Sequence, residues 1–162
     1  MTFEGKKITD YTCLVYLQAM THIYRVALGW ISKAKSISEN MEAVWTVVCL
    51  IKDIILTLLE SENDGIRTYT VKFMEMLVIT QTHLEEDSLS RANDMSLSDV
   101  PLTLKIARPR KLEEEARLVF EQMIQYHGST HISSANLMTC MGSLTNVAKY
   151  RPQFMPKVIR AL

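Results

Sequence analysis

Apolar residues recur at spacings of three and four along most of this chain, which is the pattern of amphipathic helices. The segment 61–77 shows the pattern best, because a polar turn there leads directly into such a helix. The apolar positions of this helix form one stripe: Ile66, Tyr69 or Thr70, Phe73 and Leu77. Three polar residues fall on a different stripe: Thr68, Lys72 and Glu75. We therefore expect the first stripe to pack and the second to remain free for contacts.

The turn before this helix carries start signals of its own. Asn63 or Asp64 can cap the helix by accepting hydrogen bonds from its free backbone amides. Gly65 allows the chain to turn tightly. We expect Arg67 to be held near Asp64 or near an acidic residue of the adjacent turn, and the helix to end near Thr82.

Two helices are predicted before this one. The first begins near Thr9 or Asp10 and ends near Lys35, and its inward positions are Leu14, Leu17, Thr21, Tyr24, Leu28 and Ile31. The second follows a capping box of Ser36 and Glu39. Its apolar face is wide: Met41, Val44, Trp45, Val48, Ile51, Ile55, Leu58 and Leu59. A face this wide predicts that the second helix is sandwiched between neighbouring helices.

The stretch 83–110 has no sustained period, and its Asp, Ser, Asn and Pro residues interrupt any helix. It nevertheless holds more apolar residues than a plain linker would: Leu89, Met95, Leu97, Val100, Leu102, Leu104 and Ile106. We expect a long loop that packs along the surface of the domain. Because the loop has no helix to break, proline at Leu97 or Ser98 is expected to be mild.

Helical spacing returns after the loop. A helix over 111–127 opens with three glutamates at 113–115, and its inward positions are Leu112, Ala116, Val119, Met123 and Tyr126 or His127. Ser133 or Ser134 caps the next helix, which runs to Tyr150 with Leu137, Met141, Leu144 and Ala148 on one face. Gly142 and Ser143 are expected to let a neighbour approach closely. A sixth helix starts near Phe154.

These elements predict an all-α fold, because no segment shows the alternation of a strand. About six helices joined by short polar turns are typical of an α-solenoid, in which helix pairs stack in a row. We expect residues 1–162 to form a single domain of this kind, or a fragment of one, with one long surface loop. The helices that begin at Asp10, Asp64 and Ser133 are expected to line the concave face.

Composition narrows the possible partners. The chain balances 18 basic residues against 18 acidic ones, which argues against direct nucleic-acid binding and favours a protein partner. A basic run at 105–111 has three interpretations: an import signal, an RNA contact or a solvated loop end.

Three widely spaced cysteines indicate reduced thiols. The most apolar window, 43–59, is interrupted by Lys52 and Asp53 and is too short to span a membrane, so no membrane association is expected.

No constellation of catalytic residues stands out. His127, His131 and Cys140 could suggest a metal site, but Gly128 separates the histidines and no second ligand pair follows at close spacing. The glutamates at 85–86 and 113–115 are typical of solvated turns and helix starts. We therefore expect no enzyme activity, no metal site and no cofactor.

Four ordered blocks together resemble the N-terminal HEAT-repeat domain of symplekin. They are HIYRVALGW at 22–30, NDGIRT at 63–68 followed by VKF at 71–73, HISSANL at 131–137 and RPQFM at 151–155. The resemblance implies a non-catalytic nuclear scaffold in pre-mRNA 3′-end cleavage and polyadenylation. It also implies other 3′-end processing factors as partners, and a phosphatase of the RNA polymerase II C-terminal domain that the scaffold binds and can stimulate.

The same resemblance singles out one residue for that contact. Lys72 matches a lysine that the family uses to contact the phosphatase, and Thr68 and Glu75 flank it on the predicted concave face. The alternative interpretation is a generic α-solenoid adaptor for RNA or nuclear transport. That alternative requires a basic stripe and strongly salt-dependent binding.

Overall fold

The computed structural model describes the backbone of residues 3–89 and 94–162, and the side chains of residues 10–89 and 94–162. This part of the chain forms six α-helices: α1 (Phe3–Lys33), α2 (Glu39–Thr57), α3 (Asp64–Thr80), α4 (Pro109–His127), α5 (Ser134–Tyr150) and α6 (Met155–Ala161). Short 3-10 turns follow α2, interrupt the loop before α4 and precede α6. No strand occurs in the described residues, and the predicted all-α fold is confirmed.

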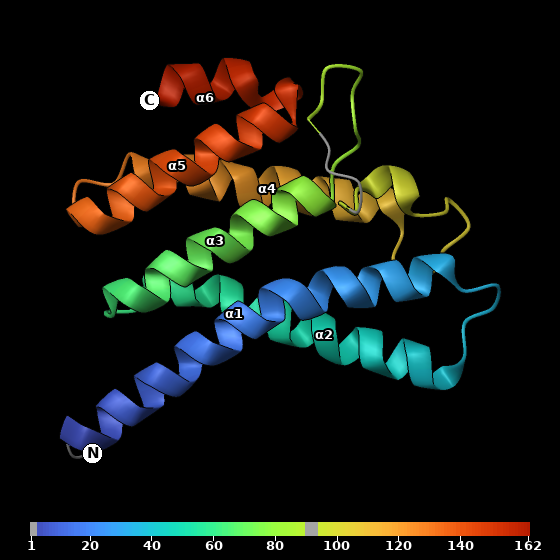
Figure 1. The fold of residues 1–162 in the computed structure, drawn as a ribbon, viewed down its shortest axis with the longest axis horizontal. Coiled ribbons are helices and arrows are strands. Elements are labelled where there is room, and N and C mark those ends of the chain that lie inside the picture. Colours follow the sequence, from blue (N-terminus) through green and yellow to red (C-terminus); the bar gives the residue numbers. More distant parts are fainter. Residues whose placement is uncertain (1–2, 90–93) are drawn as a thin grey trace.

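The helices are arranged in two layers (Figure 1). Helices α1, α3 and α5 lie side by side in one layer, whereas α2 and α4 lie behind them. Helix α6 packs against α5 at the end of the array opposite α1 and α2. This stacking is like that of an α-solenoid, and it places α3 between α1 and α5 in the same layer.

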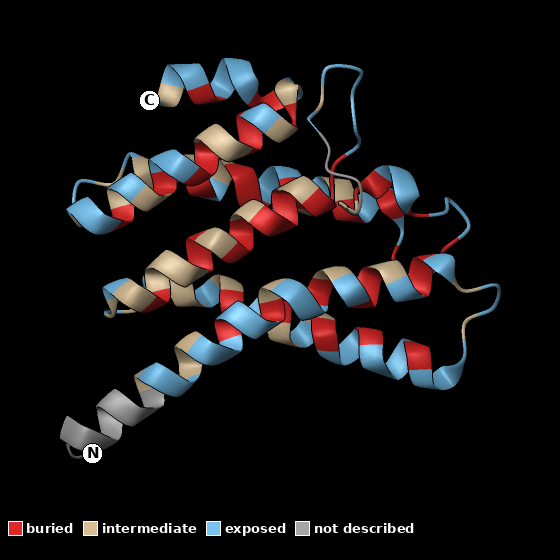
Figure 2. Cartoon of the chain, in the orientation of Figure 1, coloured by how far each residue is buried: buried red, intermediate tan, exposed pale blue. Residues whose placement is uncertain are grey.

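Helix α3 occupies the centre of the core. Nine of its residues are buried, because α1, α4 and α5 cover it from three sides: Ile66, Thr70, Val71, Phe73, Met74, Met76, Leu77, Val78 and Thr80. Figure 2 shows this concentration of buried residues along α3. Phe73 packs edge-on against Tyr24 with ring centroids 6.3 Å apart, and Tyr24 lies 5.5 Å from Trp45. The predicted apolar stripe is therefore correct, but the buried surface extends beyond it.

Several helix starts differ from the predicted ones. Helix α1 begins at Phe3, so neither Thr9 nor Asp10 caps it. Ser38 caps α2 by accepting from the backbone N–H of Met41 across 3.2 Å. An N-cap side chain accepts from a backbone amide two or three residues later, and Ser36 lies too early for the helix that forms. Among the alternatives left open, Asn63 caps α3 and Ser133 caps α5.

The prediction that α2 is sandwiched is wrong for the described chain. Met41, Trp45, Val48 and Ile55 are buried on the side that faces the core. The opposite side exposes four apolar residues: Val44, Val47, Leu50 and Ile54. Helix α2 lies at the edge of the array, and no described element covers its outer side.

Two expectations for α5 are also corrected. Met141 is 40% exposed, and the buried face is instead Asn136, Cys140, Ser143, Leu144, Val147 and Ala148. A Cβ added at Gly142 would meet no atom within 4 Å, so Gly142 makes no close approach to a neighbour. Buried Ser143 lies on the face that contacts the core. The buried face of α5 is rotated toward α3, the helix with which it shares most contacts.

The connection between α3 and α4 is anchored at several points. Residues Leu97, Val100, Leu104 and Ala107 are buried, whereas Leu89 and Leu102 are exposed. The backbone N–H of Leu97 donates to the Thr82 carbonyl across 3.2 Å and opens a 3-10 turn, Leu97–Asp99. Proline at position 97 would remove this donor, so the expectation of a mild effect there is wrong.

A buried arginine also holds the start of this loop. The guanidinium of Arg151 donates to Thr82 Oγ1 across 2.9 Å and to the Ile79 carbonyl at the end of α3. Burial lowers the pKa of Arg151, although the charge of Asp94 opposes the shift. A cation at a helix C-terminus interacts favourably with the helix dipole. Arg151 therefore links α5 to the end of α3.

A second polar network lies between α2 and α4. Lys52 is almost fully buried and pairs with Glu115 and with Asp53. Gln81 donates to Glu115 across 2.8 Å and to the Tyr24 hydroxyl across 2.6 Å. Helix α4 begins at Pro109 instead of residue 111, so Glu115 lies in its second turn and points inward. Glu115 is therefore not part of a solvated helix start.

Candidate protein-binding site

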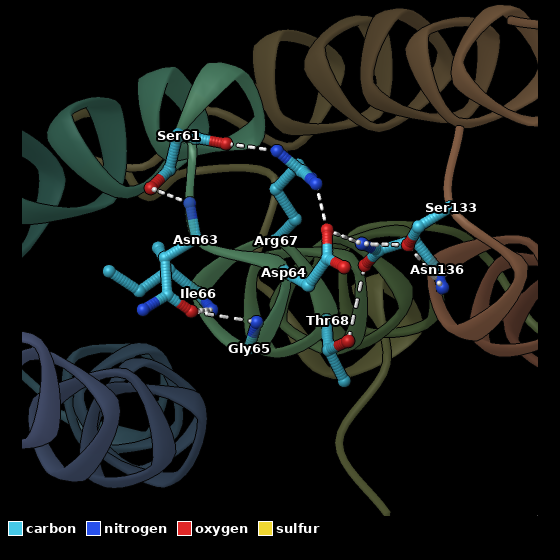
Figure 3. Close-up of polar contacts among 9 residues, drawn as sticks. All are labelled: Ser61, Asn63, Asp64, Gly65, Ile66, Arg67, Thr68, Ser133 and Asn136. Atoms are coloured by element: carbon cyan, nitrogen blue, oxygen red, sulfur yellow. Dashed lines mark hydrogen bonds and ion pairs between the residues drawn. The ribbon is translucent and has the colours of Figure 1, made fainter. Parts of the chain in front are cut away.

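Hydrogen bonds hold the capping turn that precedes the polar stripe of α3 (Figure 3). Asn63 Oδ1 accepts from the backbone N–H groups of Gly65 and Ile66 across 2.8 and 3.2 Å. Asn63 Nδ2 donates to Asp10 of α1 across 2.8 Å. Arg67 donates to Asp64 and to the carbonyl of Ser61, as predicted for this arginine. The capping turn is thus tied to the neighbouring helix α1.

A buried asparagine ties the same turn to α5. Asn136 is fully buried, and its Nδ2 donates to Asp64 Oδ1 across 3.0 Å and to Ser133 Oγ across 2.9 Å. Thr68 Oγ1 donates to Asn136 Oδ1 across 3.1 Å (Figure 3). One amide side chain therefore satisfies groups of both helices, which fixes α3 relative to α5.

Lys72 and Glu75 lie farther along the same helix. Lys72 Nζ donates to Glu75 Oε2 across 2.9 Å, and Asn146 of α5 donates to Glu75 Oε1 across 3.0 Å. The side chain of Lys72 is 43% exposed, whereas that of Glu75 is only 15% exposed. Glu75 is thus held between two donors. The lysine ammonium remains accessible beside it.

These two residues line a depression of about 410 Å³ between α1, α3 and α5. Helix α1 contributes Thr21 and Arg25, and α5 contributes Asn146 and Tyr150. Arg25 forms an ion pair with Asp94 of the long loop across 3.1 Å. The loop therefore lies against one side of the depression, and cationic, anionic and amide groups all face into it.

The structure brings together two of the three predicted site residues. Lys72 and Glu75 share the depression, whereas Thr68 lies outside its lining and bonds to Asn136. The contributions of Arg25, Asn146 and Tyr150 were not predicted. Asn136 and Asn146 lie on faces of α5 that also carry apolar residues. A polar residue on such a face is the signal in the sequence that could have indicated a contact with α3.

The described residues show none of the features of a metal site. No group of three or more His, Cys, Asp or Glu side chains gathers among them to hold a metal ion. The three cysteines are free thiols, and burial raises the pKa of Cys49 and of Cys140 to about 11. Across residues 3–89 and 94–162, no helix combines the length and hydropathy that a membrane crossing needs.

The stacked helices and the polar depression along one layer define a helical-repeat domain. The chain belongs to the Symplekin/PTA1 N-terminal family, whose model matches residues 13–162. The match covers α2 to α6 in full and α1 from Cys13 onward. Membership in this family indicates a scaffolding role in nuclear pre-mRNA 3′-end processing.

Proposed function

We propose that this chain is a non-catalytic scaffold in pre-mRNA 3′-end cleavage and polyadenylation that binds a phosphatase of the RNA polymerase II C-terminal domain. The contact is made by the layer of α1, α3 and α5 around Lys72, with Thr68 and Glu75 beside it. Other 3′-end processing factors bind the same scaffold. The observation that carries the proposal is the accessible ammonium of Lys72 at the edge of a polar depression.

The surroundings of Lys72 support a rigid contact. Thr68 and Glu75 are each bonded to an asparagine of α5, so the helix surface that presents Lys72 has little freedom to rearrange. A preorganised surface loses little conformational entropy when it binds. Stimulation of the phosphatase then comes from ordering the enzyme, because the scaffold donates no catalytic group.

The energetic role of Lys72 is in binding and not in folding. Its ion pair with Glu75 is partly exposed, and such pairs contribute only ~0–1 kcal/mol to stability. Inside an interface the same ammonium would meet an acidic or carbonyl group of the phosphatase. Removal of one partner of a desolvated charge pair costs ~2–5 kcal/mol of binding free energy, mostly because the other charge stays buried and unpaired.

Titration calorimetry with the purified phosphatase tests this proposal. We expect Lys72→Ala to weaken the complex more than tenfold, and Lys72→Glu to weaken it further through repulsion. Lys111→Ala is the matched control, because Lys111 is an exposed lysine of α4 in the other layer. Equal affinities for all four proteins would refute the site, and no binding by the folded wild type would refute the partner.

A further inference from the structure

The segment that leads into α4 carries four basic side chains within seven residues: Lys105, Arg108, Arg110 and Lys111. All four are exposed, and we call this surface the basic turn of α4. No acidic residue occurs from 100 to 112, although the chain as a whole balances its charges. The overall neutrality of the chain therefore does not describe this surface.

The glutamates that follow the basic turn do little to neutralise it, because two of the three are paired with other residues. Glu113 pairs with Arg117 across 2.9 Å. Glu115 pairs with the buried Lys52. The carboxylates of these two residues are therefore already engaged by cations outside the basic turn.

The third glutamate makes one weak contact with the basic turn. Glu114 pairs with Arg110 across 3.2 Å, and the two side chains are 62% and 90% exposed. An exposed pair of this kind contributes little and is screened by salt. The other three cations form no ion pair with the residues that the structure describes: Lys105, Arg108 and Lys111.

Buried residues alternate with the cations and hold the backbone of the basic turn in place. Four apolar side chains of this segment are buried: Leu104, Ala107, Pro109 and Leu112. The carbonyl of Ile106 accepts from the indole N–H of Trp45 on α2 across 3.0 Å. An import signal that is bound as an extended peptide would require these anchors to be released. The structure therefore disfavours the import interpretation of the basic run.

The cations are also not placed where they would stabilise the helix. Arg108 is the N-cap residue of α4, and its side chain makes no capping hydrogen bond. Arg110 and Lys111 lie in the first turn. Positive charge near a helix N-terminus interacts unfavourably with the helix dipole, and Ser, Thr, Asp and Asn are the preferred caps. A local departure from the rules of stability is typical of a functional surface.

From these observations we propose that the basic turn of α4 binds the phosphate backbone of single-stranded RNA. Guanidinium groups match the geometry of phosphate oxygens, and lysine adds a mobile point charge. Residues 100–112 contain no aromatic side chain on which a base could stack, so the contact reads the backbone and not the base sequence.

The same segment is poorly suited to an acidic protein surface. Leu102 is the one large apolar side chain exposed within residues 100–112, whereas the centre of a protein interface is apolar. A phosphate backbone needs no such centre, because release of counterions drives its binding. RNA is therefore the occupant that the composition of the basic turn favours.

This contact goes beyond the proposed binding of the phosphatase and does not depend on it. Helix α4 lies in the layer behind α1, α3 and α5, whereas Lys72 is presented by α3 (Figure 1). A scaffold with both surfaces can hold an RNA and a protein partner at the same time. Because one experiment varies Lys72 and the other the basic turn, either proposal can fail without the other.

Fluorescence anisotropy with a labelled oligouridylate of about 12 nucleotides, a length typical of single-strand sites, tests the proposal. We expect the wild type to bind, and an oligoadenylate of the same length to bind with similar affinity. The slope of log affinity against log salt is expected to be about −2 to −3, because each phosphate contact to a single strand contributes about −0.7.

A double variant of the basic turn, Arg108→Asp with Lys111→Glu, separates binding from folding. We expect RNA affinity to fall more than ~tenfold and the salt slope to become shallower by about 1.4, since two phosphate contacts are lost. The melting temperature should not fall, because acidic residues are favourable at a helix N-terminus. A merely structural role for these cations would give the opposite change in melting temperature.

The matched control is Lys149→Glu with Arg160→Glu, which changes the net charge equally on exposed residues of α5 and α6. This control is expected to bind RNA like the wild type, because screening by salt confines the effect of each charge to its surroundings. An oligoglutamate of the same length, added as competitor, is expected to displace the RNA at least ~tenfold less well than unlabelled RNA does.

Three outcomes overturn the proposal. The first is a folded wild type that binds no RNA at ~50 mM salt, where phosphate contacts are strong. The second is an equal loss of affinity in the basic-turn variant and in the control, since net charge alone would then explain binding. The third is displacement by oligoglutamate as effective as that by RNA, which would assign the basic turn to an acidic protein.

Discussion

Asn136 and Asp64 lie 72 positions apart in the sequence, and the amide of Asn136 donates to the Asp64 carboxylate across 3.0 Å. Because Asp64 begins α3 and Asn136 lies in the first turn of α5, this bond joins the starts of two neighbouring helices. The same amide accepts from Thr68. The orientation of the polar stripe on α3 therefore depends on one buried side chain.

Asn136→Ala is expected to destabilise the fold by ~1–3 kcal/mol. The substitution removes the acceptor of the Thr68 hydroxyl and the amide that donates to Asp64. Thermal denaturation followed by circular dichroism measures the loss. Asn146→Ala on the same helix is the matched control, since Asn146 is only partly buried and its partner Glu75 keeps Lys72. An equal loss in both variants would contradict the role assigned to Asn136.

Phe73→Ala is expected to cost ~3–5 kcal/mol, the usual range for truncating a buried aromatic side chain. Phe73 has no exposed surface, and its ring packs against Tyr24 in the centre of the core. Chemical denaturation would give the free energy of unfolding. Leu118→Ala, which truncates an exposed side chain, should leave this value within ~0.5 kcal/mol of the wild type. An unchanged midpoint for Phe73→Ala would mean that the core is packed differently.

Leu97→Ala is expected to destabilise the protein by ~2–5 kcal/mol, although Leu97 lies in the long loop. Its side chain is fully buried, whereas Leu102, five residues later, is 87% exposed. Leu102→Ala in the same loop should therefore change the free energy of unfolding by less than ~0.5 kcal/mol. Equal and small effects at both positions would show that the loop contributes nothing to the core.

Periodicity predicted the helices well because helical spacing is a local property. The stripe of Phe73 and Leu77 is buried as expected, and the helix ends differ from the predicted ones by about two residues or fewer, except at the start of α1, which lies six or seven residues earlier. Periodicity failed where the burial of a residue depends on which other helices pack against it. The apolar residues of α2 do not reveal which of them, such as Ile54, stay exposed at an edge. Likewise, nothing local distinguishes the inward Glu115 from the glutamates beside it.

The candidate site shows the same division. The spacing of Lys72 and Glu75 placed both on one stripe of α3, and their side chains do meet. Arg25 and Asn146 come from other helices. Each lies more than forty positions from Lys72 in the sequence, and only the packing of the helices brings them to the same depression. Such contacts leave no pattern in a single sequence.

The buried ion pair between Lys52 and Glu115 leads to a prediction about pH. Burial by itself lowers the pKa of Lys52, but hydrogen bonds and charge from Glu115 and Asp53 outweigh it, so the pKa is raised above 10.5. The folded protein then keeps this proton at a pH where the unfolded chain loses it. The stabilisation by Lys52 is complete below the unfolded pKa and is lost as the pH rises through the folded pKa.

Substitutions of Glu115 and of Lys52 are expected to change the free energy of unfolding by different amounts. Glu115→Gln leaves the ammonium of Lys52 almost buried with only Asp53 as its charged partner, and we expect a loss of ~1–3 kcal/mol at neutral pH. Lys52→Met removes the buried charge itself and is expected to cost less, because replacing a buried ion by an apolar residue of similar size is often close to neutral. Denaturant titrations of the three proteins at pH 7 and above pH ~11, where an ordinary lysine is deprotonated, measure both effects. The stability of the wild type should fall toward that of Lys52→Met at the higher pH, and a constant difference between the two would show that Lys52 does not titrate with the predicted sign.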